Sequence, residues 1–221
     1  MNGKLVSTRT IPCSPEAPDP NVISLAGEII KKGGLVVYPT DTFYGLGGDP
    51  SNIKSIQKIF NVKGRSMGKP LPLIIYHRDV LKDWVSEIPP LSVKLMDFYW
   101  PGPLTIIFPG SQKVSSLLTA GTGKIGLRWP KFPIATAMAR ETDSAIISTS
   151  ANLSGKGGIT HPDEALKDLG GLVDLIIDSG ELKPSLGSTI VDATGGHIQI
   201  IREGDLSIER ILKIEENWRS R

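Results

Sequence analysis

A basic segment, Lys63-Gly64-Arg65-Ser66-Met67-Gly68-Lys69, has the residue types needed to bind an anion. A lysine supplies a compact positive charge and an arginine a planar fork of donors, a pair that suits phosphate and carboxylate groups together. The two glycines let the backbone approach a ligand closely. A solvated surface loop is the alternative, because most Lys and Arg side chains are exposed. The residues alone leave both interpretations open.

A hydroxyl-rich segment precedes it, Pro39-Thr40-Asp41-Thr42-Phe43-Tyr44-Gly45-Leu46-Gly47-Gly48. It follows the apolar run Leu35–Tyr38, which predicts a buried strand. We interpret the segment as a glycine-permissive loop that carries the hydroxyls of Thr40, Thr42 and Tyr44. Ligands of open α/β sheets bind outside the carboxyl ends of strands, which favours a role in binding. On spacing alone, turn hydroxyls that bond to their own backbone are the favoured interpretation.

Three polar residues, Ser148, Ser150 and Asn152, alternate after a predicted strand at Ala145–Ser148. An asparagine amide offers two donors and an acceptor, which suits the base or the ribose of a nucleotide. A polar helix cap or a turn explains the same three residues equally well.

Two arginines stand at the ends of predicted strands. Arg128 closes the strand Ile125–Arg128, and Arg202 closes the strand Ile198–Arg202. A cation placed after apolar strand residues needs a partner of opposite charge. For Arg128 the sequence leaves open whether that partner is an aspartate of the protein or a carboxylate on a ligand.

Standard nucleotide and metal motifs do not fit the sequence. Gly121-Thr122-Gly123-Lys124 ends like a phosphate-binding loop, but Ile125 follows where Ser or Thr is needed, and Leu118 occupies the place of the first glycine. The three histidines are scattered and form no metal constellation. No Ser-His-acid arrangement is apparent, which argues against a covalent intermediate.

The elements that must position these residues alternate between strands and helices. Helices are predicted after Asp19 up to Gly33, after Ser51, at Ser92–Tyr99, at Phe132–Glu141, at Pro162–Leu169 with Thr160 as cap, and after Ser207. Strands are predicted at Leu35–Tyr38, Leu71–Tyr76, Leu104–Phe108, Ile125–Arg128, Ala145–Ser148, Val173–Asp178, Thr189–Asp192 and Ile198–Arg202. We expect the first five strands to share one sheet, with their motif-bearing ends at a single cleft.

This pattern predicts an α/β fold with a single domain, an open twisted mixed sheet with helices packed on it. Residues 1–18 contain three prolines and little periodicity, so we expect an N-terminal arm there, with at most an edge strand around Lys4–Val6. The domain then occupies residues 19–221.

Composition narrows the class of function. The 221 residues carry 25 Lys and Arg against 23 Asp and Glu, and a broad nucleic-acid-binding face would usually be more basic. Cys13 is the only cysteine, which excludes a disulfide framework and a thiolate metal site. The N-terminus has no apolar signal region, and no segment approaches membrane-spanning length. We therefore expect a cytoplasmic protein that has no membrane partner.

Six motifs in order resemble those of the YrdC-like family, whose enzymes are L-threonylcarbamoyladenylate synthases. Besides the two segments described first, these are Trp100-Pro101-Gly102-Pro103-Leu104-Thr105, Gly126-Leu127-Arg128-Trp129-Pro130, Ser148-Thr149-Ser150-Ala151-Asn152 and Gly187-Ser188-Thr189-Ile190-Val191-Asp192. They span roughly residues 20–205, so the resemblance covers nearly the whole chain and implies the open α/β fold of the family. Longer relatives carry an additional C-terminal domain, which we expect to be absent from these 221 residues.

The resemblance also implies a role for each candidate residue. Catalytic contacts at the carboxylate–phosphate junction are implied for Lys63 and Arg65. Threonine contacts are implied for Thr42, Tyr76, Arg128, Ser148 and Ser188. ATP contacts are implied for Arg65, Lys69, Lys124, Ser150, Asn152, Ser188 and Arg202. Lys69 departs from the pattern, because a number of relatives have an amide there.

The implied reaction makes L-threonylcarbamoyladenylate and pyrophosphate from L-threonine, bicarbonate or CO2, and ATP, for modification of adenosine in tRNA. Mg²⁺ is expected as a cofactor carried by ATP, because the sequence offers no carboxylate cluster of its own. The expected partners are the threonylcarbamoyl-transferase machinery and tRNA. One alternative is a non-catalytic protein that binds double-stranded RNA or tRNA through the basic residues between Asp49 and Lys69. Another is a carbamoyl-handling subunit of a larger assembly.

Overall fold

The structure is a computed structural model that describes residues 7–64, 66–153 and 155–219. Helices and strands alternate along the chain, as the hydrophobic pattern predicts. The strands are β1 (Arg9–Pro12), β2 (Val36–Tyr38), β3 (Gly45–Gly47), β4 (Leu73–Ile74), β5 (Leu104–Pro109), β6 (Lys124–Arg128), β7 (Ile146–Ile147), β8 (Thr149–Ser150), β9 (Leu175–Asp178), β10 (Thr189–Asp192) and β11 (Gln199–Arg202). The helices are α1 (Pro20–Lys31), α2 (Ile53–Lys63), α3 (Leu81–Trp84), α4 (Pro90–Tyr99), α5 (Ser116–Thr119), α6 (Pro133–Glu141), α7 (Pro162–Leu169) and α8 (Ile208–Arg219), with a 3₁₀ turn η1 (Arg78–Val80).

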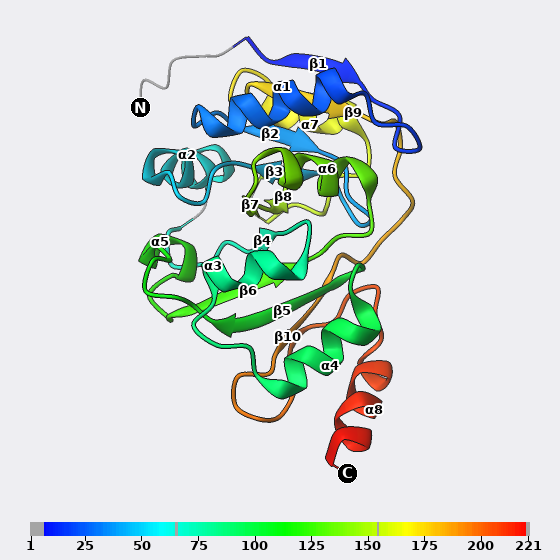
Figure 1. Cartoon of the computed structure of the whole chain (residues 1–221). Coiled ribbons are helices and arrows are strands. Elements are labelled where there is room, and N and C mark those ends of the chain that lie inside the picture. Colours follow the sequence, from blue (N-terminus) through cyan, green and yellow to red (C-terminus); the bar gives the residue numbers. More distant parts are fainter. Residues whose placement is uncertain (1–6, 65, 154, 220–221) are drawn as a thin grey trace.

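The strands of the described residues form two mixed sheets. The five-stranded sheet has the order β1-β9-β2-β3-β8, and the six-stranded sheet has the order β11-β10-β5-β6-β4-β7. Figure 1 shows the first sheet in the upper part of the molecule and the second in the lower part, with α1 beside β1 and β9, and α4 and α8 at the opposite end. The predicted class, a single α/β domain of mixed sheet and helices, is confirmed.

Our prediction that the first five apolar strands share one sheet is wrong. β2 lies in the five-stranded sheet, whereas β4, β5, β6 and β7 lie in the six-stranded one. Both edges of β2 are already occupied, because it pairs in parallel with β9 and antiparallel with β3. A continuous apolar run therefore predicts burial on both faces but does not identify the neighbouring strand.

The segment Gly45–Gly47, which we interpreted as part of a loop, is the strand β3. Gly47, and Gly48 directly after the strand, make room for protein side chains. A Cβ atom on Gly47 would lie 2.7 Å from the ring of Tyr38, and one on Gly48 would lie 2.5 Å from the hydroxyl of Ser55. Gly64 has φ +56° and ends α2, so that glycine serves as a left-handed helix cap.

The helix N-caps predicted from the sequence at Asp19, Ser51 and Thr160 lie at or within one residue of the caps in the structure. Asp19 caps α1 by accepting a hydrogen bond from the backbone N–H of Asn21, as its position before Pro20 predicts. Two predicted caps are one residue early, because Asn52 caps α2 in place of Ser51, and His161 caps α7 in place of Thr160. In both cases an adjacent side chain is a competent acceptor for the first turn.

The N-terminal segment joins the sheet. β1 pairs in parallel with β9 as an edge strand, with Arg9 opposite Leu175. The strand that we predicted around Lys4–Val6 lies outside the described residues, and the division between an arm of residues 1–18 and a domain of residues 19–221 stays a prediction. Among the described residues, no helix is both long and apolar enough to cross a bilayer.

Between β7 and β8 the chain passes from one sheet to the other across one residue, Ser148. It separates β7, in the six-stranded sheet, from β8, in the five-stranded sheet. The backbone N–H of Ser148 donates to the carbonyl of Pro72, and that of Ile147 donates to the carbonyl of Gly48, so the crossing point is bonded to both sheets. Polar residues near this crossing are therefore held at the junction between the sheets.

Candidate functional site

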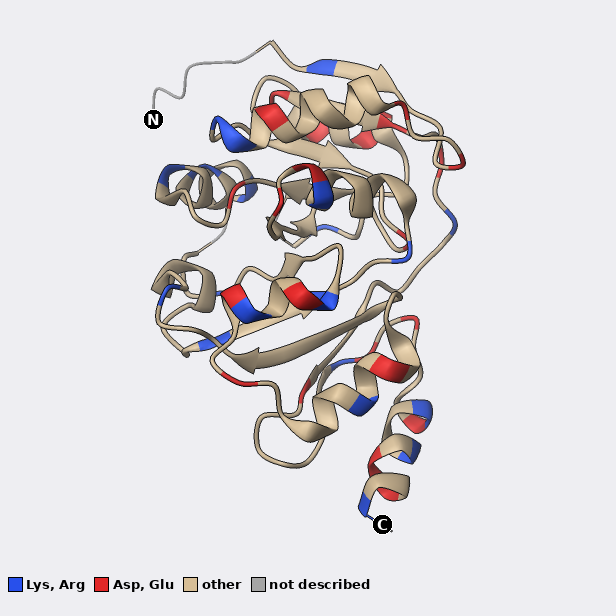
Figure 2. Cartoon of the chain, viewed as in Figure 1, with Lys and Arg blue, Asp and Glu red and all other residues tan. Residues whose placement is uncertain are grey.

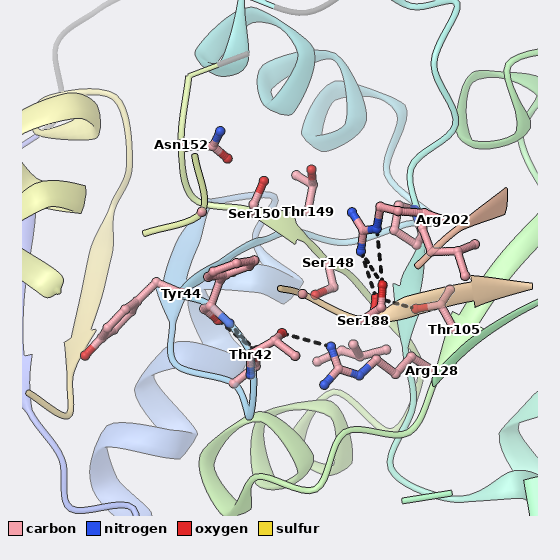
Figure 3. Close-up of a pocket in the computed structure, with 18 of the residues that line it drawn as sticks. Thr42, Tyr44, Thr105, Arg128, Ser148, Thr149, Ser150, Asn152, Ser188 and Arg202 are labelled. Carbon is pink, nitrogen blue, oxygen red and sulfur yellow. Dashed lines mark hydrogen bonds between the residues drawn. The ribbon is translucent and has the colours of Figure 1, made fainter. Parts of the chain in front are cut away.

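A cavity of about 350 Å³ lies at this junction and collects side chains from both sheets. Figure 3 shows Thr42 and Arg128 at one end of it, Asn152 and Ser150 at another, and Ser188 and Arg202 to one side. Its lining includes seven of the residues selected from the sequence: Thr42, Arg128, Ser148, Ser150, Asn152, Ser188 and Arg202. The prediction of one cleft at the motif-bearing ends is confirmed for these residues.

The loop after β2 is held by the hydroxyl of Thr40. This hydroxyl donates to the carbonyl of Phe43 (2.7 Å) and accepts from the backbone N–H groups of Thr42 and Phe43 (3.1 and 3.2 Å). Thr40 thus follows the interpretation that the sequence favours on spacing, a turn hydroxyl bonded to its own backbone. The same turn presents the buried hydroxyl of Thr42 to Arg128.

Arg128 is buried and its guanidinium is oriented by three partners. Its Nε donates to the carbonyl of Gly102 (3.0 Å), one terminal nitrogen donates to Thr42 Oγ1 (3.1 Å), and the other pairs with Asp41. The sequence left open whether Arg128 pairs with an aspartate of the protein or with a carboxylate of a ligand. In the structure its partner is the protein residue Asp41. These bonds use three of the five guanidinium N–H groups, so among the described residues one donor on each terminal nitrogen has no recorded acceptor.

Arg202 is the second guanidinium at the cavity. It donates to the backbone carbonyl of Ser188 (2.6 and 3.2 Å) and to Ser188 Oγ (3.1 Å), which in turn is bonded to the hydroxyl of Thr105 (2.9 Å). Burial lowers the pKa of Arg202, and the positive charge of Arg128 lowers it further. Two cations therefore face one cavity, where an anionic ligand would relieve their repulsion.

Lys63 holds the loop that carries Ser150 and Asn152. Its ammonium group donates to the backbone carbonyl oxygens of both residues, with a distance of 2.8 Å to that of Asn152, and only 4% of Lys63 is exposed. The amide nitrogen of Asn152 donates to the carbonyls of Leu153 and Lys156. The amide oxygen of Asn152 is buried and has no partner in the described structure, so it is an acceptor available to a ligand.

Five selected residues are not placed at the cavity by the structure, and the buried Lys63 is one of them. Lys69 is exposed and does not line it. Lys124, at the opposite end of β6 from Arg128, is paired with Asp192 at 2.7 Å. The Tyr76 hydroxyl donates to Asp143 (3.0 Å) and borders a separate cavity. Arg65 lies outside the described residues.

Charge is mixed over most of the molecule. Figure 2 shows Lys and Arg interspersed with Asp and Glu on several helices, while α2 carries lysines and no acid. One of these lysines is the buried Lys63, so it does not contribute to an exposed basic face. Among the described residues, no group of three or more His, Cys, Asp or Glu side chains is arranged to hold a metal ion.

Several cavity residues were missed at the level of sequence. They include Phe43, Thr105, Lys156, Gly158 and Gly187. Thr105, Phe43 and Gly187 lie inside the motifs quoted above, but nothing in their type or spacing distinguished them from packing residues. Lys156 and Gly158 come from a loop in which no sequence pattern indicated a role in binding.

The fold and the cavity define the chain as a two-sheet α/β domain with a cavity, lined by two arginines among other residues, where the sheets meet. The Sua5/YciO/YrdC family model, described as "Telomere recombination", matches residues 28–204. The chain belongs to this family.

Two curated relatives named threonylcarbamoyl-AMP synthase are similar over most of the chain. The protein from Pyrococcus abyssi is 34% identical over 192 residues, which cover 87% of this chain and 56% of the relative. The protein from Bacillus subtilis is 34% identical over 190 residues, which cover 86% of this chain and 55% of the relative. The chain thus spans about half the length of these relatives.

Solved structures agree with this assignment. The crystal structure of P. abyssi Sua5 complexed with L-threonine superposes with a TM-score of 0.89 at 33% identity, covering 93% of this chain and 60% of that chain. The structure of E. coli YciO superposes with a TM-score of 0.85 at 29% identity, covering 92% of this chain and 99% of that one.

Proposed function

We propose that this chain forms L-threonylcarbamoyladenylate and pyrophosphate from L-threonine, bicarbonate or CO2, and ATP, for the modification of adenosine in tRNA. The observation that carries the proposal is the cavity at the sheet junction, where two guanidinium groups, Arg128 and Arg202, face the same space. The names of the two curated relatives, and the threonine bound in the P. abyssi structure, support the same assignment.

Threonine is assigned to the end of the cavity formed by Arg128 and Thr42. Arg128 is fixed by Asp41 and Gly102 and retains one donor on each terminal nitrogen, which suits a carboxylate. Ser148 lines the same cavity and supplies a further hydroxyl. Threonine has a carboxylate and a hydroxyl, so both of its polar groups would find partners there.

ATP is assigned to the side formed by Ser150, Asn152, Ser188 and Arg202. The unpartnered amide oxygen of Asn152 would accept a hydrogen bond from the nucleotide, and Arg202 supplies a positive charge that has only neutral partners among the described residues. Lys63 does not line the cavity, and its proposed contribution is to position the Ser150–Asn152 loop through two hydrogen bonds. In this proposal magnesium arrives bound to the triphosphate.

The reaction needs no nucleophile from the protein. The amine of threonine and bicarbonate give a carbamate with loss of water. A carbamate oxygen then attacks the α-phosphorus of ATP, the bond from that phosphorus to the oxygen bridging to the β-phosphorus breaks, and pyrophosphate leaves. Placing two reactants together and stabilising the developing charge is the contribution expected of the protein.

The test is pyrophosphate release with threonine, bicarbonate and ATP each omitted in turn. We expect release only when all three are present, and we expect mass spectrometry to detect the adenylate. Serine in place of threonine tests the choice of amino acid. Pyrophosphate released from ATP without threonine, or no release under any condition, would overturn the proposal.

A further inference from the structure

Phe43 is an aromatic side chain of the cavity to which the proposed function assigns no role. It is half-buried, lines the cavity and lies next in sequence to Thr42, which is bonded to Arg128. Two glycines from loops distant in sequence, Gly158 and Gly187, lie close to its ring.

Gly158 lies against the face of the Phe43 ring. A Cβ atom built on Gly158 would be 2.5 Å from three consecutive ring carbons, Cγ, Cδ1 and Cε1, which places it over the ring rather than beside it. The backbone of Gly158 is outside the left-handed region, so an alanine there meets no conformational penalty. The three atoms nearest to this methyl group would all belong to the ring, which would have to move.

Gly187 lies at the opposite edge of the same ring. A Cβ atom built on it would be 3.0 Å from Phe43 Cε2 and 3.3 Å from a terminal nitrogen of Arg202. The ring thus fills the space between the loop that follows Asn152 and the loop that precedes Ser188.

The neighbouring residue, Tyr44, bonds to the same two loops. Its backbone accepts from the N–H of Ala151 and donates to the carbonyl of Ile159, both at 2.8 Å, and its hydroxyl donates to the carbonyl of Gly180 at 2.7 Å. The backbone next to Phe43 is therefore bonded to both of the loops that lie close to its ring.

We propose that Phe43 is a specificity-determining residue for the nucleoside part of the nucleotide, and that its ring is the flat surface against which a purine base stacks. The proposal rests on the assignment of ATP to the cavity. Both loops that lie close to the ring carry residues assigned to ATP, Asn152 and Ser188, whereas the threonine end is formed by other side chains. Aromatic rings bind nucleobases by stacking, and a purine offers a larger face than a pyrimidine.

The experiment measures binding of ATP, CTP and threonine by calorimetry to the full chain and its variants. Phe43→Ala removes the ring, and Phe43→Leu keeps apolar bulk without a flat face. Gly158→Ala displaces the ring by adding one methyl group. Gly157→Ala is the matched control, because the same methyl group there would have no neighbour within 4 Å. A thermal melt of each variant reports its folding.

We expect Phe43→Ala and Gly158→Ala each to weaken ATP binding about tenfold, the loss typical of one stacking contact, with threonine binding unchanged. Phe43→Leu should reduce the preference for ATP over CTP. The double variant Phe43→Ala/Gly158→Ala should bind ATP no more weakly than Phe43→Ala, because the added methyl group then has no ring to displace. Gly157→Ala should bind as the original chain does.

Three results would overturn the inference alone while the proposed function stands. One is unchanged ATP binding and ATP preference in Phe43→Ala or in Phe43→Leu. Another is a loss of threonine binding as large as the loss of ATP binding. The third is a Gly158→Ala defect that persists in the absence of Phe43. If the original chain binds no ATP at all, the proposed function fails, and this inference fails with it.

Discussion

Replacing Arg128 by lysine separates the charge of this residue from its geometry. The guanidinium bonds in three directions, to Gly102, Thr42 and Asp41, and keeps two further donors. A lysine ammonium can still pair with Asp41, but it cannot also reach the other acceptors and hold two donors towards a ligand. A hydrogen bond to a charged group contributes roughly 1.5–3 kcal/mol. Loss of one such bond to the threonine carboxylate should weaken threonine binding about tenfold to a hundredfold.

Stability should also fall, by an amount similar to the loss of binding free energy. The carbonyl of Gly102 and the hydroxyl of Thr42 lose a charged donor, which should lower the free energy of unfolding by about 1–3 kcal/mol, while Asp41 keeps a cationic partner. Threonine calorimetry and a thermal melt measure the two quantities. The matched control is Arg78→Lys, since Arg78 also pairs with an aspartate, Asp97, but does not line the cavity. Threonine bound equally well by Arg128→Lys and by the original chain would refute the role given to the planar fork.

Three further predictions concern buried polar groups. Lys63→Met should lower the free energy of unfolding by roughly 2–4 kcal/mol, because two backbone carbonyls lose their donor. Urea unfolding measures this change. Unchanged stability together with a loss of activity would mean that the amine acts on the substrate instead. Burial raises the pKa of Tyr44 to about 12 from 10.0, so the stability that it contributes is complete below pH 10 and is lost as pH rises to about 12. Alkaline unfolding should show this loss and should show less of it in Tyr44→Phe; equal profiles would contradict it. Burial raises the pKa of Asp192, but hydrogen bonds from Lys124 and Thr194 outweigh it and hold the pKa below 3.8, so this stability is lost only as pH falls below that value. Lys124→Met should move acid unfolding to higher pH, and an unmoved midpoint in circular dichroism would exclude the pair as its cause.

The order and type of the main elements followed from hydrophobic periodicity, because burial of one face leaves a regular pattern along the chain. The helix Pro162–Leu169 was predicted at the bounds that the structure gives. The division into two sheets was not predictable in this way, since strand pairing depends on neighbours far away in sequence. β1 and β9, for example, pair over more than 160 residues, with Arg9 opposite Leu175.

Residues of the cavity were anticipated from the sequence where a motif lies at the end of a predicted strand. Arg128 and Ser148 lie at the cavity because β6 and β7 end there. The pairing of Arg128 with Asp41 was left open, because residue types alone do not rank a protein carboxylate against a ligand carboxylate. Lys124 was assigned to ATP through the resemblance, whereas in the fold it lies at the opposite end of β6 from Arg128 and pairs with Asp192. Tyr76 was assigned through resemblance alone, and the structure places its hydroxyl on Asp143.

The five-stranded sheet combines strands that are far apart in the sequence, which has a consequence for synthesis of the protein on the ribosome. β2 and β3 are made early, but their outer neighbours β9 and β8 are made only after the central part of the six-stranded sheet. The apolar faces of β2 and α1 therefore emerge well over 100 residues before the strands that complete their sheet. Contacts this distant in sequence form slowly, and the exposed strands are open to wrong pairing meanwhile. The nascent chain is thus expected to need protection by chaperones until residue 178 has left the exit tunnel.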